Sequence, residues 1–401
     1  MSGTVFAGVT LAPRDPILGL TEAFVADTRP GKVNLGAGVY LNDQGTVPLL
    51  EAVREAERLR LEAAPPRAYL PMEGYAAYNR AVQQLLFGAH PALPAEGRSV
   101  SFEALGGTGG LKIGADFLKR LSPDATVWIS DPSWENHRAL FEAAGFAVKT
   151  YAYYDSASHG VRFEALLADV ASMRAGDVVV LHACCHNPTG VDLDAEQWHT
   201  LIDALAARGV LPFLDMAYQG FAEGVEADAL ALNLLAASGQ SFLVASSFSK
   251  SFSFYGERVG ALSVVTQSRD ETDRVVSQIK RVIRTNYSNP PTHGAAVVAT
   301  VLNTPTLRAL WEGELAGMRE RIRAMRAGFV DGLRSLGVQR DFSFVTAQRG
   351  MFSYSGLRPD QVERLREEFA IYAVSTGRIC LASLNSRNLA PVCAAIAKVL
   401  H

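Results

Sequence analysis

A lysine that follows a predicted buried strand is the residue most suited to covalent chemistry. Lys250 lies among hydroxyl and aromatic side chains in the segment SSFSKSFSFYGER, residues 246–258. Desolvation would favour its neutral amine, which a Schiff-base lysine needs, and Arg258 could supply a fixed charge for a phosphate. A lone lysine after a strand is more often a surface residue. The SxxK pattern of serine acyl enzymes is also present, but the chain lacks SDN and KTG.

A glycine-rich segment, LGGTGGLKIG at 105–114, is predicted to form a turn that leads into an amphipathic helix. Small residues there would expose backbone N–H groups at the positive end of a helix, which suits a phosphate. The glycine spacing fits neither GxGxxG nor GxxxxGK[ST], so a dinucleotide and a P-loop nucleotide are not supported. A tight turn packed on a sheet explains the segment equally well.

Polar residues close two further predicted strands. Asn187 lies in CHNPTG at 185–190, and Asp215 and Tyr218 lie in DMAY at 215–218. Ligands of open α/β sheets bind beyond the carboxyl ends of strands, so these residues could meet Lys250 in one crevice. An aspartate there could pair with the protonated ring nitrogen of pyridoxal phosphate. Turn chemistry and helix capping are the structural alternatives.

His182 and His186 suggest a metal site, because two cysteines lie between them. In a continuous strand, residues four apart share a face but are about 13 Å from each other, too far to hold one ion. The sequence therefore predicts no metal site. His137 is expected to be a packed or capping residue.

The elements that would position these residues alternate between strands and helices. Near-continuous apolar runs predict strands buried on both faces, at 126–130, 178–183, 210–215, 242–246 and 259–265. Helical spacing and a C-terminal Gly209 predict a helix over 194–208. A second helix over 305–337, about 45 Å long, is long enough to join two domains. A smaller C-terminal domain would hold a helix near 360–369 and a strand near 372–374. An α/β architecture follows.

Composition narrows the classes of function. The 401 residues carry 38 Lys and Arg against 41 Asp and Glu, and 48% are hydrophobic, as in a globular protein. The chain has no basic block and no apolar run of about 20 residues, so neither nucleic acid nor a membrane is expected as a partner. Small molecules are the expected ligands. The N-terminus lacks the apolar core of a secretory signal, and four cysteines without a CxxC pair fit a cytoplasmic protein.

Taken together, the motifs resemble the class I aminotransferases, the pyridoxal-phosphate enzymes of the aspartate and aromatic aminotransferase group. The bacterial tyrosine aminotransferase branch is the most similar. The resemblance extends over nearly the whole chain, through NLGAGVY at 34–40, YLPMEG at 69–74, GGTGG at 106–110, DPSWENH at 131–137, CCHNPTG at 184–190, DMAYQGF at 215–221, SFSK at 247–250, YGERVG at 255–260, RTNYSNPP at 284–291, RGMFSYSGL at 349–357 and STGR at 375–378.

The resemblance implies the fold type I of pyridoxal-phosphate transferases, in which a large domain has a mixed, mostly parallel sheet flanked by helices. It implies an N-terminal arm at 1–12, a large cofactor domain at 46–315, and a small α/β domain made of 13–45 with 316–401. Closure of the small domain on substrate is expected. Cis bonds before Pro132 and Pro188 are suggested, although the sequence leaves their state open.

It also implies a role for each site residue. Lys250 would hold the cofactor and then move the substrate's α-proton. Asp215, supported by His137, would pair with the ring nitrogen, and Trp134 would stack on the ring. Asn187 and Tyr218 would bind the phenolic oxygen. The phosphate would be held by Gly107, Thr108, Ser247 and Arg258.

On the substrate side, Arg378 would bind the α-carboxylate, with Gly38, Trp134 and Asn187 nearby. Two residues would reach in from the second subunit of a homodimer: Tyr69 to the phosphate and Arg284 to a distal carboxylate.

Features of both branches make the substrate a mixed expectation. Apolar Leu41 and Val47 favour aromatic side chains, whereas Thr108 and Asn289 resemble the aspartate branch. We therefore expect an aromatic-amino-acid aminotransferase that also accepts aspartate and uses 2-oxoglutarate as acceptor. The alternative is an aspartate aminotransferase.

Three rival classes of protein share some of these features. A lyase or decarboxylase of the same fold would keep Lys250 and Asp215, but two carboxylate-binding arginines favour a transaminase. A regulatory protein without turnover would usually lose a catalytic residue or carry an added DNA-binding module, and the sequence shows neither. A nicotinamide dehydrogenase fails on glycine spacing.

Overall fold

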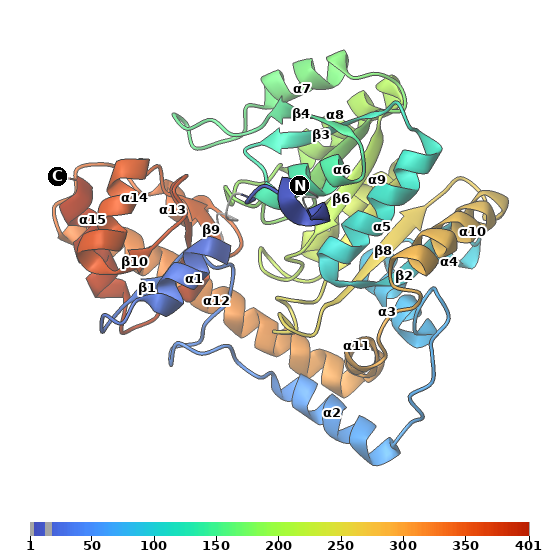
Figure 1. Ribbon diagram of the computed structural model, residues 1–401, viewed down its shortest axis with the longest axis horizontal. Helices are drawn as coiled ribbons and strands as arrows, with labels where there is room; N and C mark the ends of the chain where they lie inside the picture. Colours follow the sequence, from blue (N-terminus) through green and yellow to red (C-terminus); the bar gives the residue numbers. More distant parts are fainter. Residues whose placement is uncertain (1–3, 13–17, 401) are drawn as a thin grey trace.

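A seven-stranded sheet in the order β2-β8-β7-β6-β5-β3-β4 is the centre of the molecule (Figure 1). We describe it from a computed structural model that covers residues 4–12 and 18–400. β8 is antiparallel to both neighbours, and β3 to β7 run parallel to one another. The strands are β2 (Ser99–Leu105), β3 (Thr126–Asp131), β4 (Ala147–Ala152), β5 (Val178–His182), β6 (Leu211–Met216), β7 (Phe242–Ser247) and β8 (Val259–Val265).

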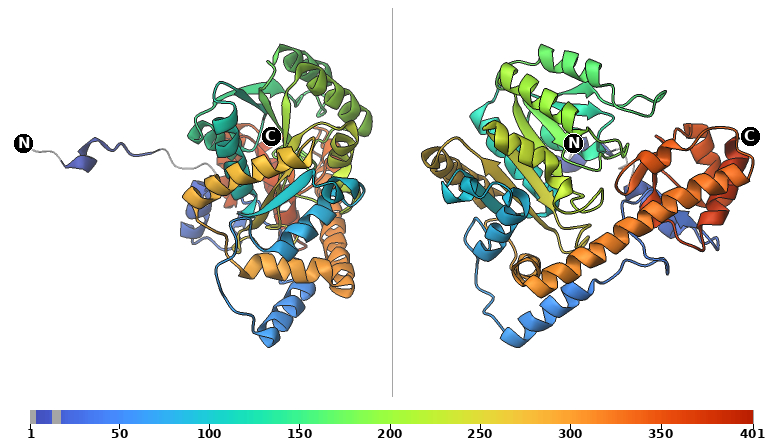
Figure 2. Two further views of the ribbon diagram at one scale, coloured as in Figure 1. Left: turned by 90° about the vertical axis from the view of Figure 1, so that its right-hand side faces the viewer. Right: turned by 180° about the vertical axis from the view of Figure 1, so that it is seen from behind.

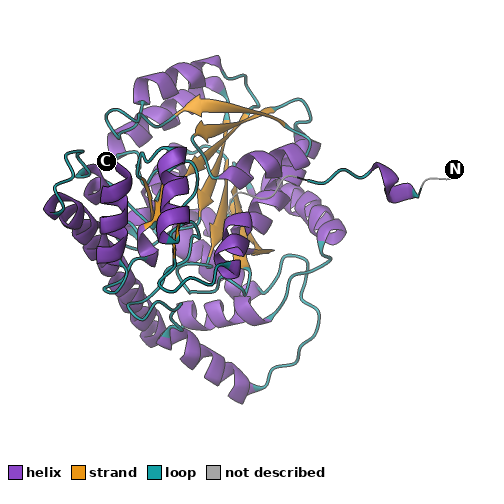
Figure 3. Ribbon diagram, turned by 60° about the vertical axis from the view of Figure 1, so that its left-hand side comes forward, coloured by secondary structure: helices purple, strands orange, loops and turns teal. Residues whose placement is uncertain are grey.

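Helices cover both faces of this sheet (Figure 3). One face packs against α5 (Gly106–Leu121), α6 (Glu135–Ala143) and α10 (Arg269–Asn286). The other packs against α3 (Ala76–Phe87), α7 (Phe163–Ser172), α8 (Ala195–Arg208), α9 (Leu230–Ser238) and α11 (His293–Asn303), with α2 (Glu51–Ala63) beyond them. Short helices are η1 (Val5–Gly8), α4 (Ala92–Ala95) and η2 (Ala227–Ala229).

This layering explains why the central strands are apolar throughout. Every residue of β5, β7 and β8 is buried, whereas β4 at the edge of the sheet exposes several of its residues. Neighbouring residues of one strand, such as Val178 and Val179, belong to the two different cores. The predicted α/β fold is confirmed, and the five predicted strands agree with the structure to within one residue at each end.

The smaller lobe is built from both ends of the chain. Its elements are α1 (Leu18–Ala26), β1 (Val33–Asn34), α13 (Phe344–Ala347), β9 (Phe352–Tyr354), α14 (Pro359–Phe369), β10 (Ile371–Tyr372), β11 (Arg378–Cys380), η3 (Leu381–Ser383) and α15 (Leu389–Leu400). β1 pairs in parallel with β10, and β11 pairs antiparallel with β9. A separate hydrophobic core holds this lobe together.

One long helix, α12 (Pro305–Ser335), joins the two lobes (Figure 2). Leu315, Met318 and Ile322 pack in the core of the larger lobe, whereas Phe329 and Leu333 pack in that of the smaller. At 1.5 Å per residue, its 31 residues extend about 46 Å. The domain ranges given above remain a prediction, and their residues 1–3, 13–17 and 401 lie outside the described residues.

Two local expectations are resolved here. The peptide bonds before Pro132 and Pro188, whose state the sequence left open, are both cis. The predicted turn at 105–114 is instead mostly helix, because α5 begins at Gly106 directly after β2. Within the described residues, no helix combines the length and apolar character that crossing a membrane requires.

Candidate active site

A cavity of about 240 Å³ opens at the carboxyl ends of β5, β6 and β7. Eleven of the residues predicted for the site line it: Gly38, Gly107, Thr108, Trp134, Asn187, Asp215, Tyr218, Ser247, Lys250, Arg258 and Arg378. They come from both lobes, since Gly38 and Arg378 belong to the smaller one. The convergence expected from the strand ends is therefore present in a single chain.

Lys250 projects into this cavity from the segment after β7. Its Nζ lies 4.9 Å from the centre of the Tyr218 ring. Burial lowers the pKa of Lys250 to about 8; the carboxylate of Asp215 opposes this effect, and the guanidinium of Arg258 adds to it. At pH 7 about a tenth of this amine is therefore neutral and nucleophilic, far more than for a lysine with the ordinary pKa of about 10.4.

Asp215 ends a short chain of polar groups behind the cavity. Its Oδ2 lies 2.9 Å from His137 Nε2, and His137 Nδ1 lies 2.9 Å from Ser133 Oγ. Burial alone would raise the pKa of Asp215, but the hydrogen bond and charge of His137, together with His182 and Lys250, bring it below its usual value. The site therefore holds a fixed anion that can pair with a cationic ring nitrogen.

The opposite end of the cavity is built for an anion. The N-terminus of α5 presents backbone N–H groups that the helix leaves unpaired. A Cβ atom on Gly106 would lie 2.5 Å from Arg258 Nη2, and one on Gly107 would lie 3.1 Å from Ser247 Cβ. A side chain at Gly106 would therefore displace the arginine, and one at Gly107 would require the serine to shift by a few tenths of an ångström.

Arg378 occupies the wall toward the smaller lobe. It is almost completely buried, and its guanidinium lies over the Phe352 ring with Cζ 4.4 Å from the ring centre. Nη1 donates to Asn187 Oδ1 at 3.2 Å and Nη2 donates to the Gly36 carbonyl at 2.8 Å. Within the part of the chain that the structure describes, Nε has no hydrogen-bond partner. A carboxylate from a ligand would complete the bonds of this buried cation.

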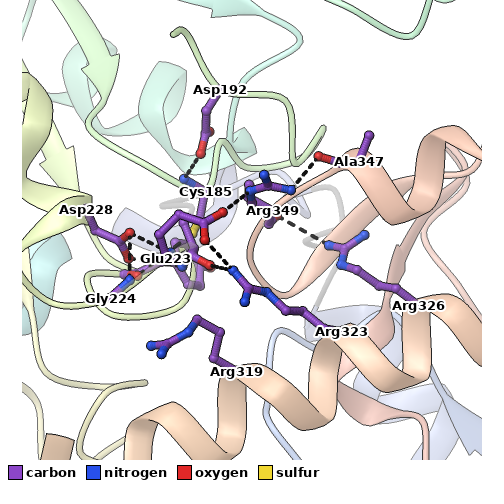
Figure 4. A network of polar contacts seen from close by, with 12 residues as sticks. Cys185, Asp192, Glu223, Gly224, Asp228, Arg319, Arg323, Arg326, Ala347 and Arg349 are labelled. Carbon is purple, nitrogen blue, oxygen red and sulfur yellow. Dashed lines mark hydrogen bonds and ion pairs between the residues drawn. The ribbon is translucent and has the colours of Figure 1, made fainter. Parts of the chain in front are cut away.

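A polar network holds the loops that carry Asn187 and Phe352 (Figure 4). Asp192 accepts from the backbone N–H groups of Cys185 and His186, both at 2.7 Å. Arg349 pairs with Glu223 at 2.8 Å, and Arg323 of α12 pairs with the same carboxylate at 2.6 Å. The network therefore ties the site loop of the larger lobe to the smaller lobe.

Buried Arg326 organises the segment that carries Phe352. Its guanidinium donates to the carbonyls of Val345, Gly350 and Phe352 and to Ser353 Oγ. Burial lowers the pKa of Arg326 to about 10. Because one cation satisfies several backbone carbonyls, it defines the path of this segment beside the cavity.

Six predicted site residues do not line the cavity of this chain. His137 lies behind Asp215, as the hydrogen bond requires. Tyr69 is 94% exposed, Arg284 is exposed, and Asn289 donates to the Leu70 carbonyl at 3.0 Å. Leu41 is half-buried and Val47 is exposed. The roles predicted for the other five therefore depend on contacts outside a single chain or on a bound substrate.

Sequence reasoning missed His182, Ser249, Tyr255 and Phe352, all of which line the cavity. His182 closes β5, the same strand-end position that identified Asp215, so that signal was available. Its two ring nitrogens are buried, and residues 4–12 and 18–400 offer them no hydrogen-bond partner. Tyr255 is held by its hydroxyl, which accepts from the Tyr40 N–H at 2.8 Å.

The distance argument against a metal at His182 and His186 was wrong. The strand ends at His182 and Cys185 adopts a left-handed conformation with φ of 52°, so the chain folds back and the two rings lie 4.3 Å apart. Both nitrogens of His186 are instead engaged, with Ser130 Oγ at 2.9 Å and Thr189 Oγ1 at 2.8 Å. The pair is thus a structural packing contact.

Comparison with known proteins gives this geometry a family. The family model described as aminotransferase class I and II matches residues 30–396. This chain belongs to that family. It is 66% identical to the aspartate aminotransferase of Pseudomonas aeruginosa over 397 residues, covering 99% of this chain and all of that protein. It is 51% identical to the aromatic-amino-acid aminotransferase of Escherichia coli, with 99% and 100% covered.

A solved structure extends the agreement to three dimensions. The aromatic-amino-acid aminotransferase of Burkholderia pseudomallei, described as covalently bound to pyridoxal phosphate, superposes with a TM-score of 0.97 at 63% identity, covering all of both chains. The family model and these relatives are all named as aminotransferases, so the predicted enzyme class and the predicted resemblance are confirmed.

Proposed function

We propose that the protein is a pyridoxal-phosphate aminotransferase that takes amino groups from aromatic amino acids and aspartate and passes them to 2-oxoglutarate. One observation carries the proposal. A low-pKa lysine, a buried aspartate, an anion cradle and a buried arginine converge on a single cavity. These four features match the carbonyl, ring nitrogen and phosphate of the cofactor and the carboxylate of a substrate.

The residues present fit this cofactor. When bound, pyridoxal phosphate supplies an electron sink for bonds at the substrate's α-carbon. The Lys250 amine would attach it covalently, Asp215 would keep its ring nitrogen protonated, and Asn187 and Tyr218 would bind its phenolic oxygen. Gly107, Thr108, Ser247 and Arg258 would hold the phosphate at the start of α5, and Trp134 would cover the ring.

Residues of this chain would then have separate roles in transfer of the amino group. Arg378 would bind the α-carboxylate and so orient the α-carbon toward Lys250. The released Lys250 amine, which is partly neutral at pH 7, would accept the proton from that carbon. It would then deliver this proton to the C4′ carbon of the cofactor. His137 would keep Asp215 charged and in place throughout, because it donates to Oδ2.

A homodimer with shared sites is part of the proposal. Val5, Phe6, Val9 and Leu11 of the N-terminal segment are 73–100% exposed, and this segment stands clear of the rest of the chain (Figure 2). Such apolar surface calls for a covering partner. Tyr69 and Arg284 are exposed and outside the cavity, which supports their acting in the site of a second copy.

We also propose a cytoplasmic location, which the four free thiols favour.

Dual specificity is the finer part of the proposal. Leu41 and Val47 would give an apolar wall to the mouth of the site, and Arg284 would still accept a dicarboxylate. The relatives carry both names, aspartate aminotransferase in Pseudomonas aeruginosa and aromatic-amino-acid aminotransferase in Burkholderia pseudomallei. Restriction to aspartate is therefore the second candidate.

Absorbance spectroscopy of the purified holoenzyme tests the proposal. The visible cofactor band should be converted to the ultraviolet band of the aminated cofactor by phenylalanine and by aspartate, added separately. Lys250→Ala should lose this conversion. Failure of the wild-type protein to bind pyridoxal phosphate would refute the assignment. A response to aspartate alone would select the second candidate.

A further inference from the structure

Glu135 places a carboxylate next to the buried arginine of the cavity. It is the first residue of α6 and directly follows Trp134. Its Oε2 lies 3.7 Å from Arg378 Nη1, and this buried oxygen has no hydrogen-bond partner among the described residues. A negative charge at the first turn of a helix is favourable, so the dipole of α6 stabilises a carboxylate at this position.

The other contacts of Arg378 are neutral. They are the Asn187 amide oxygen, the Gly36 carbonyl and the Phe352 ring. Across the described ranges 4–12 and 18–400, Glu135 is the one carboxylate recorded within 4 Å of a nitrogen of this guanidinium. Arg378 therefore has a single anionic neighbour, at a distance too long for a good hydrogen bond.

We propose that Glu135 is an internal competitor for the substrate's α-carboxylate. The inference rests on the proposed function, in which Arg378 binds that group. In the free enzyme the Glu135 carboxylate balances the charge of the buried arginine. The carboxylate of a bound ligand then forms short, charge-assisted hydrogen bonds with Arg378, which Glu135 does not form. The ligand thereby displaces Glu135 from its place beside Arg378.

Two physical points support competition over a purely structural role. Charges about 3–4 Å apart interact strongly in a partly desolvated site. The Glu135 carboxylate therefore attracts Arg378 and repels the carboxylate of an arriving ligand. The long contact also means that Glu135 holds Arg378 loosely and can be displaced. The result is weaker binding of amino acids and oxo acids alike, which keeps product from being held after transfer.

Direct binding of an unreactive carboxylate tests this inference. The probe is 3-phenylpropanoate, which has the carboxylate but no amino group, titrated into the holoenzyme and followed by calorimetry. Glu135→Gln should bind it about three- to tenfold more tightly than the wild type. Glu142→Gln is the matched control, because Glu142 lies on the same helix and, among the described residues, forms its ion pair with Arg138 at 3.2 Å. Its affinity should equal that of the wild type.

Kinetics provide a second readout that a structural disturbance would not reproduce. Glu135→Gln should lower KM for phenylalanine and for aspartate by a similar factor, without raising kcat. Damage to the site would raise KM instead. The gain in affinity should disappear in the double variant Glu135→Gln with Arg378→Lys, since competition requires the arginine.

The outcomes separate the two levels of the argument. If Arg378→Lys weakens binding but Glu135→Gln leaves it unchanged or weaker, the inference is overturned and the proposed function stands. If Arg378→Lys binds the probe like the wild type, Arg378 is not the carboxylate site. That result would overturn both the assignment and the inference.

Discussion

At the scale of single residues, the pKa of Lys250 governs how the protein acquires its cofactor. Burial brings this pKa to about 8. Below that pH the amine carries a proton and cannot attack a carbonyl carbon, whereas above it the amine is free. Covalent attachment of pyridoxal phosphate to the apoprotein should therefore speed up as pH rises, with a midpoint near 8.

The measurement is the rate at which the visible band grows after apoprotein and cofactor are mixed, between pH 6 and about 10. Lys280→Ala is a suitable control, because Lys280 is paired with Glu73 outside the cavity. A midpoint near the ordinary lysine value of about 10.4 would show that burial does not perturb Lys250 in solution.

Much of this chemistry could be predicted residue by residue. Lys250 and Asn187 follow apolar strands and Asp215 lies near the end of one, and the rule that ligands bind at strand ends brings them together. The contact between His182 and His186 could not be predicted in the same way. It depends on the left-handed conformation of Cys185, a residue type that gives no signal for such a turn.

At the scale of elements, the close approach of α5 to the sheet sets the position of the anion cradle. α5 packs against β7 and β8. A Cβ atom on Gly110 would lie 2.8 Å from the Ala261 carbonyl oxygen, a backbone atom that cannot move aside cheaply. α5 can pack this close to the sheet because Gly110 has no side chain.

Gly110→Ala should therefore push the start of α5 away from the sheet. We expect a loss of about 1–3 kcal/mol in the free energy of unfolding, together with weaker binding of pyridoxal phosphate. Gly317→Ala on α12 is the matched control, because its Cβ would meet open space. It should stabilise by about 0.5–1 kcal/mol.

Urea unfolding of the two apoproteins and cofactor titration of each would measure both effects. Equal stability of the two variants would contradict the packing argument.

The glycines themselves were visible in the sequence, but their role was not. A run of glycines predicts a turn, and only the tertiary packing of β8 shows why a helix tolerates them here.

At the scale of the whole molecule, the proposed shared site makes activity a property of two chains. Lys250→Ala removes the amine of a chain's own site, whereas Arg284→Ala removes the distal carboxylate clamp from its partner's site. Each variant alone should be nearly inactive with aspartate. A mixed dimer has both defects in one site and none in the other.

Co-refolding equal amounts of the two variants should therefore restore aspartate activity to about a quarter of the wild-type value per chain, since about half of the dimers are mixed. Each variant refolded alone is the control. Absence of recovery, with mixed dimers demonstrated by differential tagging, would place Arg284 in the site of its own chain. A single sequence identifies these surface residues only through resemblance, because nothing in their local pattern says which chain they serve.

The pairing of β1 with β10 has a consequence for biosynthesis. Val33 lies beside Ile371, so the two strands are separated by roughly 340 residues of chain. At about 5–20 residues per second, a ribosome needs roughly 17–70 s to make the second strand after the first. During that interval the whole sheet of the larger lobe can emerge and fold while β1 has no partner. β1 is thus translated long before β10 but becomes ordered late, and during this delay the nascent chain depends most on protection by chaperones.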